Sequence, residues 1–352
     1  MKTYLITGGA GFIGSNFIIY MMRKHSDIHI INLDKLTYAG NLENLSEIAN
    51  DPRYEFIHGD ITNSETVGML FTKYPIDVVV HFAAESHVDR SILDPGVFAH
   101  TNVIGTLTLL NAALAHWNDH HGGFRPGVKF MHVSTDEVYG SLDDTGYFTE
   151  TTPINPHSPY SASKAASDLF VLSFFDTYGL PVNITRCSNN YGPYQFPEKL
   201  IPLMIHNALN HKSLPVYGKG LNIRDWLFVD DHCKAIDMVI DGGKSGEVYN
   251  VGGHNERSNI TIVQTIVDYI HKHVDSHVNE SLISYVEDRK GHDWRYAIDP
   301  GKIWHELGWK PEIPFEEGIQ LTIQWYLANN AWLNNIINGE YLKYYELIYR
   351  NR

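Results

Sequence analysis

The feature that most constrains this chain is a glycine-rich loop near its beginning, between an apolar strand and a helix. The run Tyr4–Thr7 precedes the loop Gly8-Gly9-Ala10-Gly11-Phe12-Ile13-Gly14, and residues 15–24 have a helical pattern. Glycine allows a tight turn and a close approach to a pyrophosphate, and a helix start supplies amide donors. A glycine pattern alone also fits an ordinary turn, but its place between strand and helix predicts dinucleotide binding.

Asp34, at the end of the second predicted strand His29–Asp34, points to the identity of the dinucleotide. An acid here accepts hydrogen bonds from the ribose 2′-hydroxyl and repels a 2′-phosphate, which favours NAD over NADP. The neighbouring Lys35 argues the other way, because a cation could tolerate the phosphate. We expect NAD+ as the cofactor.

Two more predicted strands carry candidate cofactor contacts at their ends. Residues 54–61 include Asp60, which could accept a hydrogen bond from the adenine amino group or could instead cap the following helix. Residues 77–84 are apolar, as central strands of parallel sheets are. They end in Ala83 and Ala84, which are small enough for a cofactor to pass close by.

The alternation of strands and helices predicts an α/β fold with a Rossmann-like, doubly wound parallel sheet. After Ser188 the pattern is less regular and richer in aromatic residues, which indicates a smaller, interleaved substrate-binding domain. We predict that residues 1–187 form the NAD-binding domain, with a contribution from 225–250, and that 188–352 form mainly the second domain.

A hydroxyl and two carboxyls follow the predicted buried strand 130–133. Ligands of open parallel sheets bind beyond the carboxyl ends of the strands, so Thr135, Asp136 and Glu137 are candidate catalytic residues. Neighbouring residues of a regular strand point to opposite faces. Both carboxyls therefore reach one site only if the backbone has left the strand, and one of them could simply cap the next turn.

Tyr160 and Lys164 stand one turn apart in the predicted helix 160–178. A tyrosine with its usual pKa of about 10 is a poor base, and a lysine one turn away should stabilise the phenolate and lower that pKa. Beside a nicotinamide this pair could remove a hydroxyl proton, although Tyr-x-x-x-Lys also occurs on ordinary helix faces. The two carboxyls suggest a second proton transfer, with one acting as acid and the other as base.

Composition excludes several other classes of protein. A net charge of −14 argues against nucleic acid as a partner. Two cysteines form no disulfide framework, and the 20 histidines show no metal-binding spacing, so we expect no metal site. No signal peptide precedes the first strand, and we expect no apolar run near the roughly 20 residues that span a bilayer. We predict a cytoplasmic protein with no membrane partner.

The chain resembles the extended short-chain dehydrogenase/reductase family in three motifs: the glycine loop, Ser134-Thr135 and Tyr160-x-x-x-Lys164. Within that family, four segments and the run Thr135–Gly140 are similar to the dTDP-glucose 4,6-dehydratases. The segments are Asn189-Asn190-Tyr191-Gly192-Pro193-Tyr194-Gln195, Glu198-Lys199-Leu200-Ile201-Pro202, Asn222-x-Arg224-Asp225-Trp226 and Asp288-Arg289-x-Gly291-His292-Asp293-x-Arg295-Tyr296-Ala297-Ile298-Asp299.

The resemblance implies an NAD-dependent hydro-lyase that converts dTDP-glucose to dTDP-4-keto-6-deoxy-glucose, as a homodimer. Tyr160, assisted by Thr135 and Lys164, would deprotonate the 4-hydroxyl while hydride leaves C4. The 4-ketone acidifies the C5 proton, which Glu137 would remove while Asp136 protonates the departing 6-hydroxyl. Hydride then returns to C6.

Two sets of binding residues follow from the loops and from the resemblance. The cofactor set is Gly8, Gly11, Phe12, Ile13, Gly14, Asp34, Lys35, Thr37, Gly40, Asp60, Ile61, Ala83, Ala84, Tyr160, Lys164 and Asn189. The set for the sugar nucleotide is Ser86, His87, Thr135, Asn190, Glu198, Lys199, Leu200, Val216, Tyr217, Arg224, Asn259, Arg289, His292 and Tyr296. Guanidinium groups match phosphate oxygens well, which supports Arg224 and Arg289.

Two alternatives stay open. A nucleotide-sugar 4-epimerase would share the cofactor site and the Tyr160–Lys164 pair but would not need Asp136 and Glu137 as acid and base. A non-catalytic NAD sensor could use the same fold. An intact set of Thr135, Tyr160 and Lys164 argues against the sensor, which has no need of a base.

Overall fold

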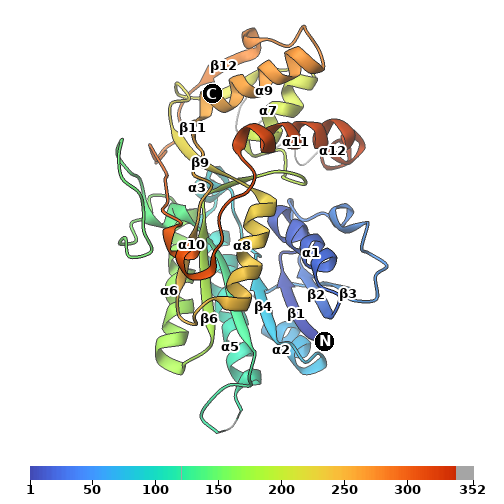
Figure 1. The fold of residues 1–352 in the computed structure, drawn as a ribbon, viewed down its shortest axis with the longest axis vertical. Helices are drawn as coiled ribbons and strands as arrows, with labels where there is room; N and C mark the ends of the chain where they lie inside the picture. The colour runs from blue at the N-terminus through green and yellow to red at the C-terminus, as the bar shows by residue number, and fades with distance from the viewer. Residues whose placement is uncertain (120, 338–352) are drawn as a thin grey trace.

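The computed structural model describes residues 1–119 and 121–337, and its centre is a seven-stranded parallel sheet (Figure 1). Its strands, in spatial order, are β10 (Val248–Val251), β6 (Val182–Cys187), β5 (Lys129–Thr135), β4 (Val78–His81), β1 (Lys2–Thr7), β2 (Ile28–Asp34) and β3 (Tyr54–His58). The order reverses between β1 and β4, so the predicted Rossmann-like doubly wound sheet is confirmed.

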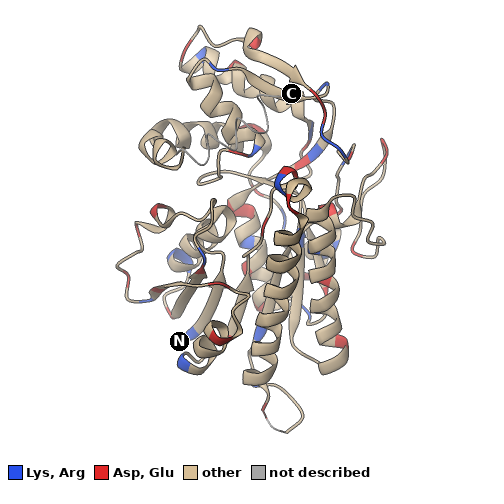
Figure 2. Cartoon of the chain, turned by 180° about the vertical axis from the view of Figure 1, so that it is seen from behind, with Lys and Arg blue, Asp and Glu red and all other residues tan. Residues whose placement is uncertain are grey.

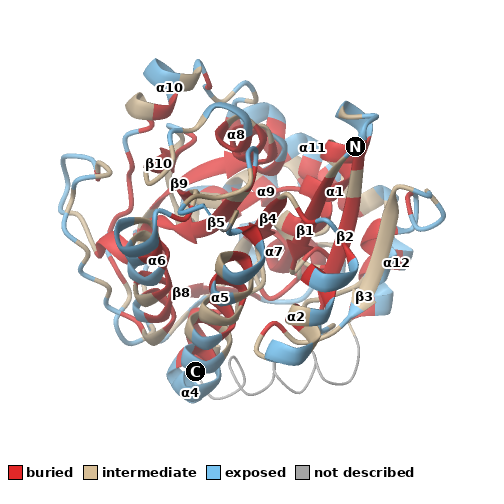
Figure 3. Cartoon of the chain, turned by 90° about the horizontal axis from the view of Figure 1, so that it is seen from below, coloured by how far each residue is buried: buried red, intermediate tan, exposed pale blue. Residues whose placement is uncertain are grey.

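Side chains alternate between two cores along each strand, because neighbouring residues of a strand point to opposite faces. Ile6 packs on one face of the sheet and Leu5 on the other. The first face is covered by α1 (Phe12–Lys24), α8 (Val229–Gly242) and α10 (Gly301–Leu307), and the second by α2 (Ser64–Lys73), α5 (Gly105–Trp117) and α6 (Pro159–Tyr178). Figure 3 shows the central strands buried, the edge strand β3 only partly buried, and the flanking helices exposed along their outer faces.

A smaller lobe lies beside the carboxyl edge of this sheet (Figure 1). It contains a sheet in the order β11 (Glu256–Ser258), β9 (Ile223–Phe228), β7 (Asn189–Tyr191), and a pair formed by β12 (Ile283–Val286) and β8 (Leu214–Tyr217). Four helices complete its core: α7 (Leu200–Leu209), α9 (Asn259–His273), α11 (Phe315–Ala328) and α12 (Asn330–Ile336). The predicted domain boundaries stay a prediction, but the chain does return from this lobe to the large sheet through α8 and β10.

Short helical elements fill the loops: η1 (Leu42–Leu45), α3 (Val88–Leu93), α4 (Pro95–Phe98), the π-helix η2 (Ala99–Ile104), η3 (Asp136–Tyr139) and η4 (Glu280–Leu282). The helical segment from α4 to α5 is therefore not one regular α-helix, because the π-helix η2 lies between them. The predicted strand 54–61 is also too long: β3 ends at His58, and Asp60 lies in the turn beyond it.

The helical segment Pro95–Trp117 contradicts one expectation from the sequence. By length and composition, with a mean hydropathy of 1.3, this segment of the described chain is apolar and long enough to cross a membrane. His100 and Asn102 break the apolar run when it is read residue by residue, but they average out over the whole helix. Since 39% of this stretch is buried and Leu110 packs against the sheet, we interpret it as a core helix.

Two hydrogen bonds tie the smaller lobe to the large one, and a third holds α11 to the loop after β7. The Trp332 indole donates to Asn44 Oδ1 at 2.8 Å, next to the loop that follows β2. Tyr326 donates through its hydroxyl to the carbonyl of Gln195 at 2.5 Å. Asn16 of α1 donates to the carbonyl of Pro193 at 2.9 Å. The last helices are thereby held against the loops beyond the sheet.

Charged side chains of both signs are interspersed over the molecule, as Figure 2 shows from behind. Together with the net charge of −14, this distribution makes the electrostatic surface mainly acidic rather than basic.

We expect Leu110→Ala to lower the free energy of unfolding by about 2–5 kcal/mol, because it leaves a cavity between α5 and the sheet. Leu110 is fully buried. The matched control is Leu321→Ala in α11, where the side chain is 42% exposed and the loss should be about 0.5 kcal/mol. Urea denaturation followed by circular dichroism measures both, and equal losses would contradict this packing.

Candidate active site

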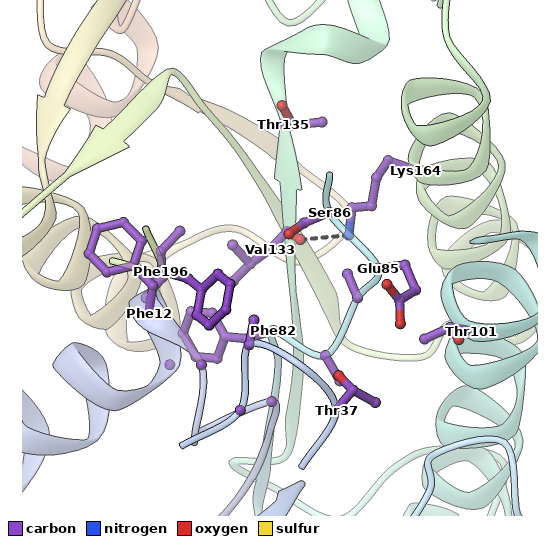
Figure 4. Close-up of a pocket in the computed structure, with 18 of the residues that line it drawn as sticks. Phe12, Thr37, Phe82, Glu85, Ser86, Thr101, Val133, Thr135, Lys164 and Phe196 are labelled. Carbon is purple, nitrogen blue, oxygen red and sulfur yellow. Dashed lines mark hydrogen bonds between the residues drawn. The ribbon is translucent and has the colours of Figure 1, made fainter. Parts of the chain in front are cut away.

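A cavity of about 340 Å³ lies at the carboxyl edge of the large sheet, where the strand order reverses (Figure 4). Loops that follow β1 to β6 supply its walls. All of the residues in the predicted cofactor set line it: Gly8, Gly11, Phe12, Ile13, Gly14, Asp34, Lys35, Thr37, Gly40, Asp60, Ile61, Ala83, Ala84, Tyr160, Lys164 and Asn189. Thr135, Asp136 and Glu137 line it too. The structure thus brings both groups to one place, and their individual roles stay predictions.

The glycine loop has no room for side chains at two positions. Gly8 has a φ of +72°, and a Cβ there would lie 2.6 Å from Ala83 Cα at the end of β4. A Cβ on Gly14 would lie 2.3 Å from the Gly8 carbonyl oxygen. The loop therefore passes close to the end of β4, and its backbone at Gly8 and Gly14 leaves no room for a side chain.

Asp34 holds this loop in place from the end of β2. One carboxylate oxygen accepts from Ala10 N at 2.9 Å and the other from Leu36 N at 2.8 Å. Lys35, the residue that weakened the case for NAD, is paired with Asp60 at 2.8 Å. Asp60 itself caps only a local turn, because Asn63 rather than Asp60 is the N-cap of α2.

The donors and acceptors in the cavity fit a dinucleotide. No side chain within the described residues caps α1, which leaves the amides of its first turn available to a phosphate. Several buried polar atoms on the cavity wall also find no partner in the described part of the chain: Ser134 Oγ, Asp136 Oδ2, Asn189 Oδ1 and Gln195 Oε1. Such atoms are costly unless something hydrogen-bonds to them, so they mark where a polar ligand would bind.

The backbone leaves β5 at Thr135, as the two carboxyls require. Asp136–Tyr139 form the 3₁₀-helix η3, with Thr135 as its N-cap, whose hydroxyl accepts from Glu137 N at 3.3 Å. Gly140 ends the turn with a φ of +89°, and a Cβ there would lie 2.4 Å from the Asn155 carbonyl oxygen. Because η3 is no longer a strand, Asp136 and Glu137 both line the cavity.

The two carboxyls differ in their surroundings. Burial raises the pKa of Asp136 well above its usual value, and the charge of Glu137 raises it further. Burial also raises the pKa of Glu137, but Arg289, Lys199 and Arg224 act against that rise. The pKa of both carboxyls is thus raised by burial, but only at Glu137 do three cations act to favour the carboxylate.

Helix α6 presents Tyr160 and Lys164 to the same cavity. It begins at Pro159, which suits the first turn of a helix, and Ser158 is its N-cap. The Ser158 hydroxyl accepts from Ser161 N at 3.0 Å, completing a capping box. Tyr160 thus lies in the first turn, and Lys164 follows one turn later on the same side.

The prediction that Lys164 lowers the pKa of Tyr160 is wrong for these contacts. Burial raises the pKa of the Tyr160 phenol, and Glu137 adds to the rise, while the hydrogen-bonded Thr135 hydroxyl acts against it. Burial likewise lowers the pKa of Lys164 to about 8. The Lys164 ammonium donates to the Val133 carbonyl at 2.9 Å, the bond drawn in Figure 4.

The predicted substrate set is divided between two places. Ser86, Thr135, Asn190, Glu198 and Lys199 line the cavity. The rest lie outside its lining, on α3, α7, β8, β9, α9 and the loop after β12: His87, Leu200, Val216, Tyr217, Arg224, Asn259, Arg289, His292 and Tyr296. Contacts of these residues with a nucleotide stay a prediction.

Two members of the outer group are nevertheless near the carboxyls. Arg224 and Arg289 both act on the charge of Glu137. The Arg224 guanidinium lies 4.1 Å from the centre of the Tyr296 ring and donates to the Asp293 carbonyl at 3.0 Å. These contacts fix one cation between the lobes, next to the cavity.

Part of the cavity wall comes from residues that the sequence did not single out. Phe82 and Val133 lie at the ends of β4 and β5, where the carboxyl-edge rule could have found them. Thr101 and Phe196 also line the cavity, but they come from the π-helix and from the loop after β7. No local motif marks these two.

Comparison with known proteins gives a consistent result. The profile of the family described as GDP-mannose 4,6 dehydratase matches residues 5–322. A dTDP-glucose 4,6-dehydratase of Xanthomonas campestris pv. campestris is 54% identical over 344 residues, 97% of each chain.

Two solved structures of similar proteins are also enzymes of that kind. The dTDP-glucose 4,6-dehydratase of Bacillus anthracis, in complex with NAD, is 48% identical with a TM-score of 0.86, covering 96% of this chain and 100% of its own. DesIV, the dTDP-glucose 4,6-dehydratase of Streptomyces venezuelae with NAD and TYD bound, is 46% identical with a TM-score of 0.87, covering 95% and 99%.

We expect Gly8→Ala to weaken NAD+ binding at least about tenfold, or about 1.4 kcal/mol, because the new Cβ would push the loop away from β4. The control is Gly68→Ala in α2, where a Cβ meets nothing within 4 Å. That change should leave NAD+ affinity as it is and stabilise the helix by about 0.5–1 kcal/mol. Isothermal titration calorimetry after removal of bound nucleotide measures the affinities. Unchanged NAD+ binding by Gly8→Ala would contradict the role of the glycine loop in binding the dinucleotide.

Proposed function

The chain belongs to the GDP-mannose 4,6 dehydratase family within the extended short-chain dehydrogenases/reductases, and we propose that it dehydrates dTDP-glucose to dTDP-4-keto-6-deoxy-glucose with NAD+. The observation that carries this proposal is the placement of Asp136 and Glu137 in the same cavity as Tyr160 and Lys164. Oxidation of an alcohol needs only the second pair and the cofactor. The carboxyls supply the groups for removing water.

The first task of the site is to take a proton from the 4-hydroxyl of the sugar. Bound NAD+ accepts hydride from C4 and later returns it to C6, and its ring charge favours the phenolate of a nearby tyrosine. Tyr160 accepts the hydroxyl proton, and the Thr135 hydroxyl orients the phenol. Lys164, which belongs to the predicted cofactor set, lines the same cavity one turn further along α6.

The second task is elimination across C5 and C6. The 4-ketone acidifies the C5 proton, and Glu137, whose ionised form the surrounding cations favour, is the base that removes it. Asp136, whose protonated form burial favours, donates a proton to the departing 6-hydroxyl. Two carboxyls in such different surroundings suit an acid and a base that act together.

The alternatives are less well supported. A 4-epimerase needs no acid and base at Asp136 and Glu137, and burying two carboxyls without a task would be costly. A sensor needs no catalytic base. The 54% identity to a dTDP-glucose 4,6-dehydratase over nearly the whole chain favours the dehydratase over both.

The substrate nucleotide would extend from the cavity toward the smaller lobe. Lys199 donates to the Ser86 carbonyl at 2.9 Å and lines the cavity, while Arg224 and Arg289 stand beyond it. These three cations suit a diphosphate between the sugar and the thymidine. The remaining members of the predicted substrate set would then contact the nucleotide from β8, α9 and the loop after β12.

We also propose a cytoplasmic homodimer. Large apolar side chains are exposed on neighbouring elements of one face: Ile92 and Leu93 of α3, Val97 of α4, Ile104 of η2, and Leu169 and Phe170 of α6. A contiguous apolar face of this kind is typical of a protein–protein interface. The same face contains the apolar segment that is long enough to cross a membrane, so pairing of two copies explains its composition.

Incubation with dTDP-glucose should give a product lighter by one water, with no net formation of NADH. Mass spectrometry of the nucleotide sugars measures the product, and absorbance follows NADH. A panel with UDP-glucose, GDP-mannose and CDP-glucose tests the choice of nucleotide. Conversion to dTDP-galactose would instead establish the epimerase, and binding of NAD+ without turnover of any sugar nucleotide would favour the sensor.

Glu137→Gln should slow dehydration by at least about 100-fold while oxidation at C4 continues, because the amide cannot act as a base. Reduced nicotinamide would then accumulate on the enzyme, which stopped-flow absorbance detects. The control is Glu85→Gln, another carboxyl on the cavity wall, which should change dehydration less than about tenfold. Full dehydration by Glu137→Gln would show that another group removes the C5 proton.

A further inference from the structure

Lys164 is a cation in an unfavourable place. Its side chain is 3% exposed, and the ammonium lies beneath the cavity, against the end of β5. Burial favours the neutral amine and lowers the pKa of Lys164 to about 8, although nearby negative charge partly opposes this effect. Something in the interior must supply a compensating negative charge.

Asp168 is the anion placed to do so. It follows Lys164 by one turn of α6 and is fully buried. Its charge acts to raise the pKa of Lys164, against the effect of burial. Although burial acts to raise the pKa of Asp168, Arg186, His132 and Lys164 hold it down to about 2, so the carboxylate is charged.

His132 lies between the two groups without carrying charge. Its Nε2 is 3.5 Å from Lys164 Nζ and 3.4 Å from Asp168 Oδ1. Burial, with Lys164 adding to it, lowers the pKa of His132 to about 4, so the ring is neutral. A neutral ring fixes the separation of ammonium and carboxylate without cancelling the charge of either.

A second cation competes for the same carboxylate. Arg186 Nε donates to Asp168 Oδ2 at 2.8 Å. Arg186 is held independently of Asp168, because its NH1 donates to Tyr139 Oη at 2.9 Å and its guanidinium lies 4.8 Å from the centre of the Tyr139 ring. Two buried cations thus share one buried anion. Because Arg186 is bound to Asp168, it weakens the electrostatic attraction between Asp168 and Lys164.

The other ionisable groups around Lys164 do not provide that charge. Burial favours the neutral forms of Asp136, Tyr160, Cys187 and His81. Glu137 is the remaining carboxyl, and the cations that act to lower its pKa are Arg289, Lys199 and Arg224. The groups that face Lys164 from its own helix, from β4, β5, β6 and from η3 are Tyr160, Asp168, His81, His132, Arg186, Cys187, Asp136 and Glu137.

We propose that Asp168 is a positioning residue for the catalytic pair, which keeps Lys164 charged and directed at the site, and that Arg186 sets the strength of this effect. The proposal deepens the proposed function and rests on it, since Lys164 lines the cavity to which we assign the reaction. Nothing in the local motif Tyr160-x-x-x-Lys164 includes Asp168 or Arg186, which come together only in the fold.

The test compares Asp168→Asn with Arg186→Gln, two variants that break the same buried pair from opposite ends. Each is made in the full chain with NAD+ bound, and NAD+ content and thermal unfolding show that each variant is folded. The protonation of Lys164 is measured by NMR titration of ¹³Cε-labelled lysine, with its signal assigned by loss in Lys164→Met. The pH dependence of kcat/KM for dTDP-glucose is measured in parallel.

The two variants should shift in opposite directions. Asp168→Asn removes the anion, so the pKa of Lys164 and the alkaline limb of kcat/KM should fall by about one unit. Arg186→Gln removes the competing cation, so both should rise. A merely structural role would move both variants in the same direction or leave the Lys164 titration unchanged, and either result would overturn the proposal.

Two further controls keep the outcomes separate. If Asp168→Asn does not fold, the neutral pair Asp168→Asn/Arg186→Gln replaces it, and the Lys164 titration should still move to lower pH. An unshifted titration in that variant would also overturn the proposal. Failure of the wild-type enzyme to convert dTDP-glucose would refute the proposed function, while the NMR titration would still decide whether Asp168 keeps Lys164 charged.

Discussion

The whole site depends on the departure of the backbone from β5 immediately after Thr135. Had the strand continued, one of the two carboxyls would have pointed into the core beneath the sheet. The 3₁₀-turn that replaces it is anchored below by Tyr139, whose hydroxyl donates to Asn250 at 2.8 Å and whose ring stacks on Phe148. Gly140, which has a positive φ, then ends this turn. A local turn thus decides which chemistry the cavity can perform.

Burial is the common cause behind the electrostatics of this site. The same loss of water that favours the protonated form of Asp136 also favours the neutral form of Lys164. Burial therefore cannot favour a protonated Asp136 without also weakening the charge of Lys164. The protein resolves this by using separate partners for each group. Asp136 has no cation hydrogen-bonded to it among the described residues, whereas Lys164 has an anion one turn away.

The sequence was sufficient for the large sheet and for most of the cavity wall, because these depend on local signals. Strand periodicity, the glycine loop and residues such as Asp34 at strand ends follow rules that act over a few positions. The pKa of Tyr160 could not be predicted in this way, since it depends on burial and on Glu137 from another element. The same is true of Phe196 and of the pairing of Asp168 with Arg186, which require segments distant in the chain to meet.

The hydrogen bond between Trp332 and Asn44 has a consequence for how long a cofactor stays in place. Asn44 belongs to the segment that follows β2, and Thr37 and Gly40 of that segment form part of the cavity wall. Opening the wall at this end would require α12 to detach from it as well. A cofactor that is regenerated at the end of each catalytic cycle does not need to be exchanged. Slow dissociation therefore does not limit turnover, and the enzyme need not bind the cofactor again.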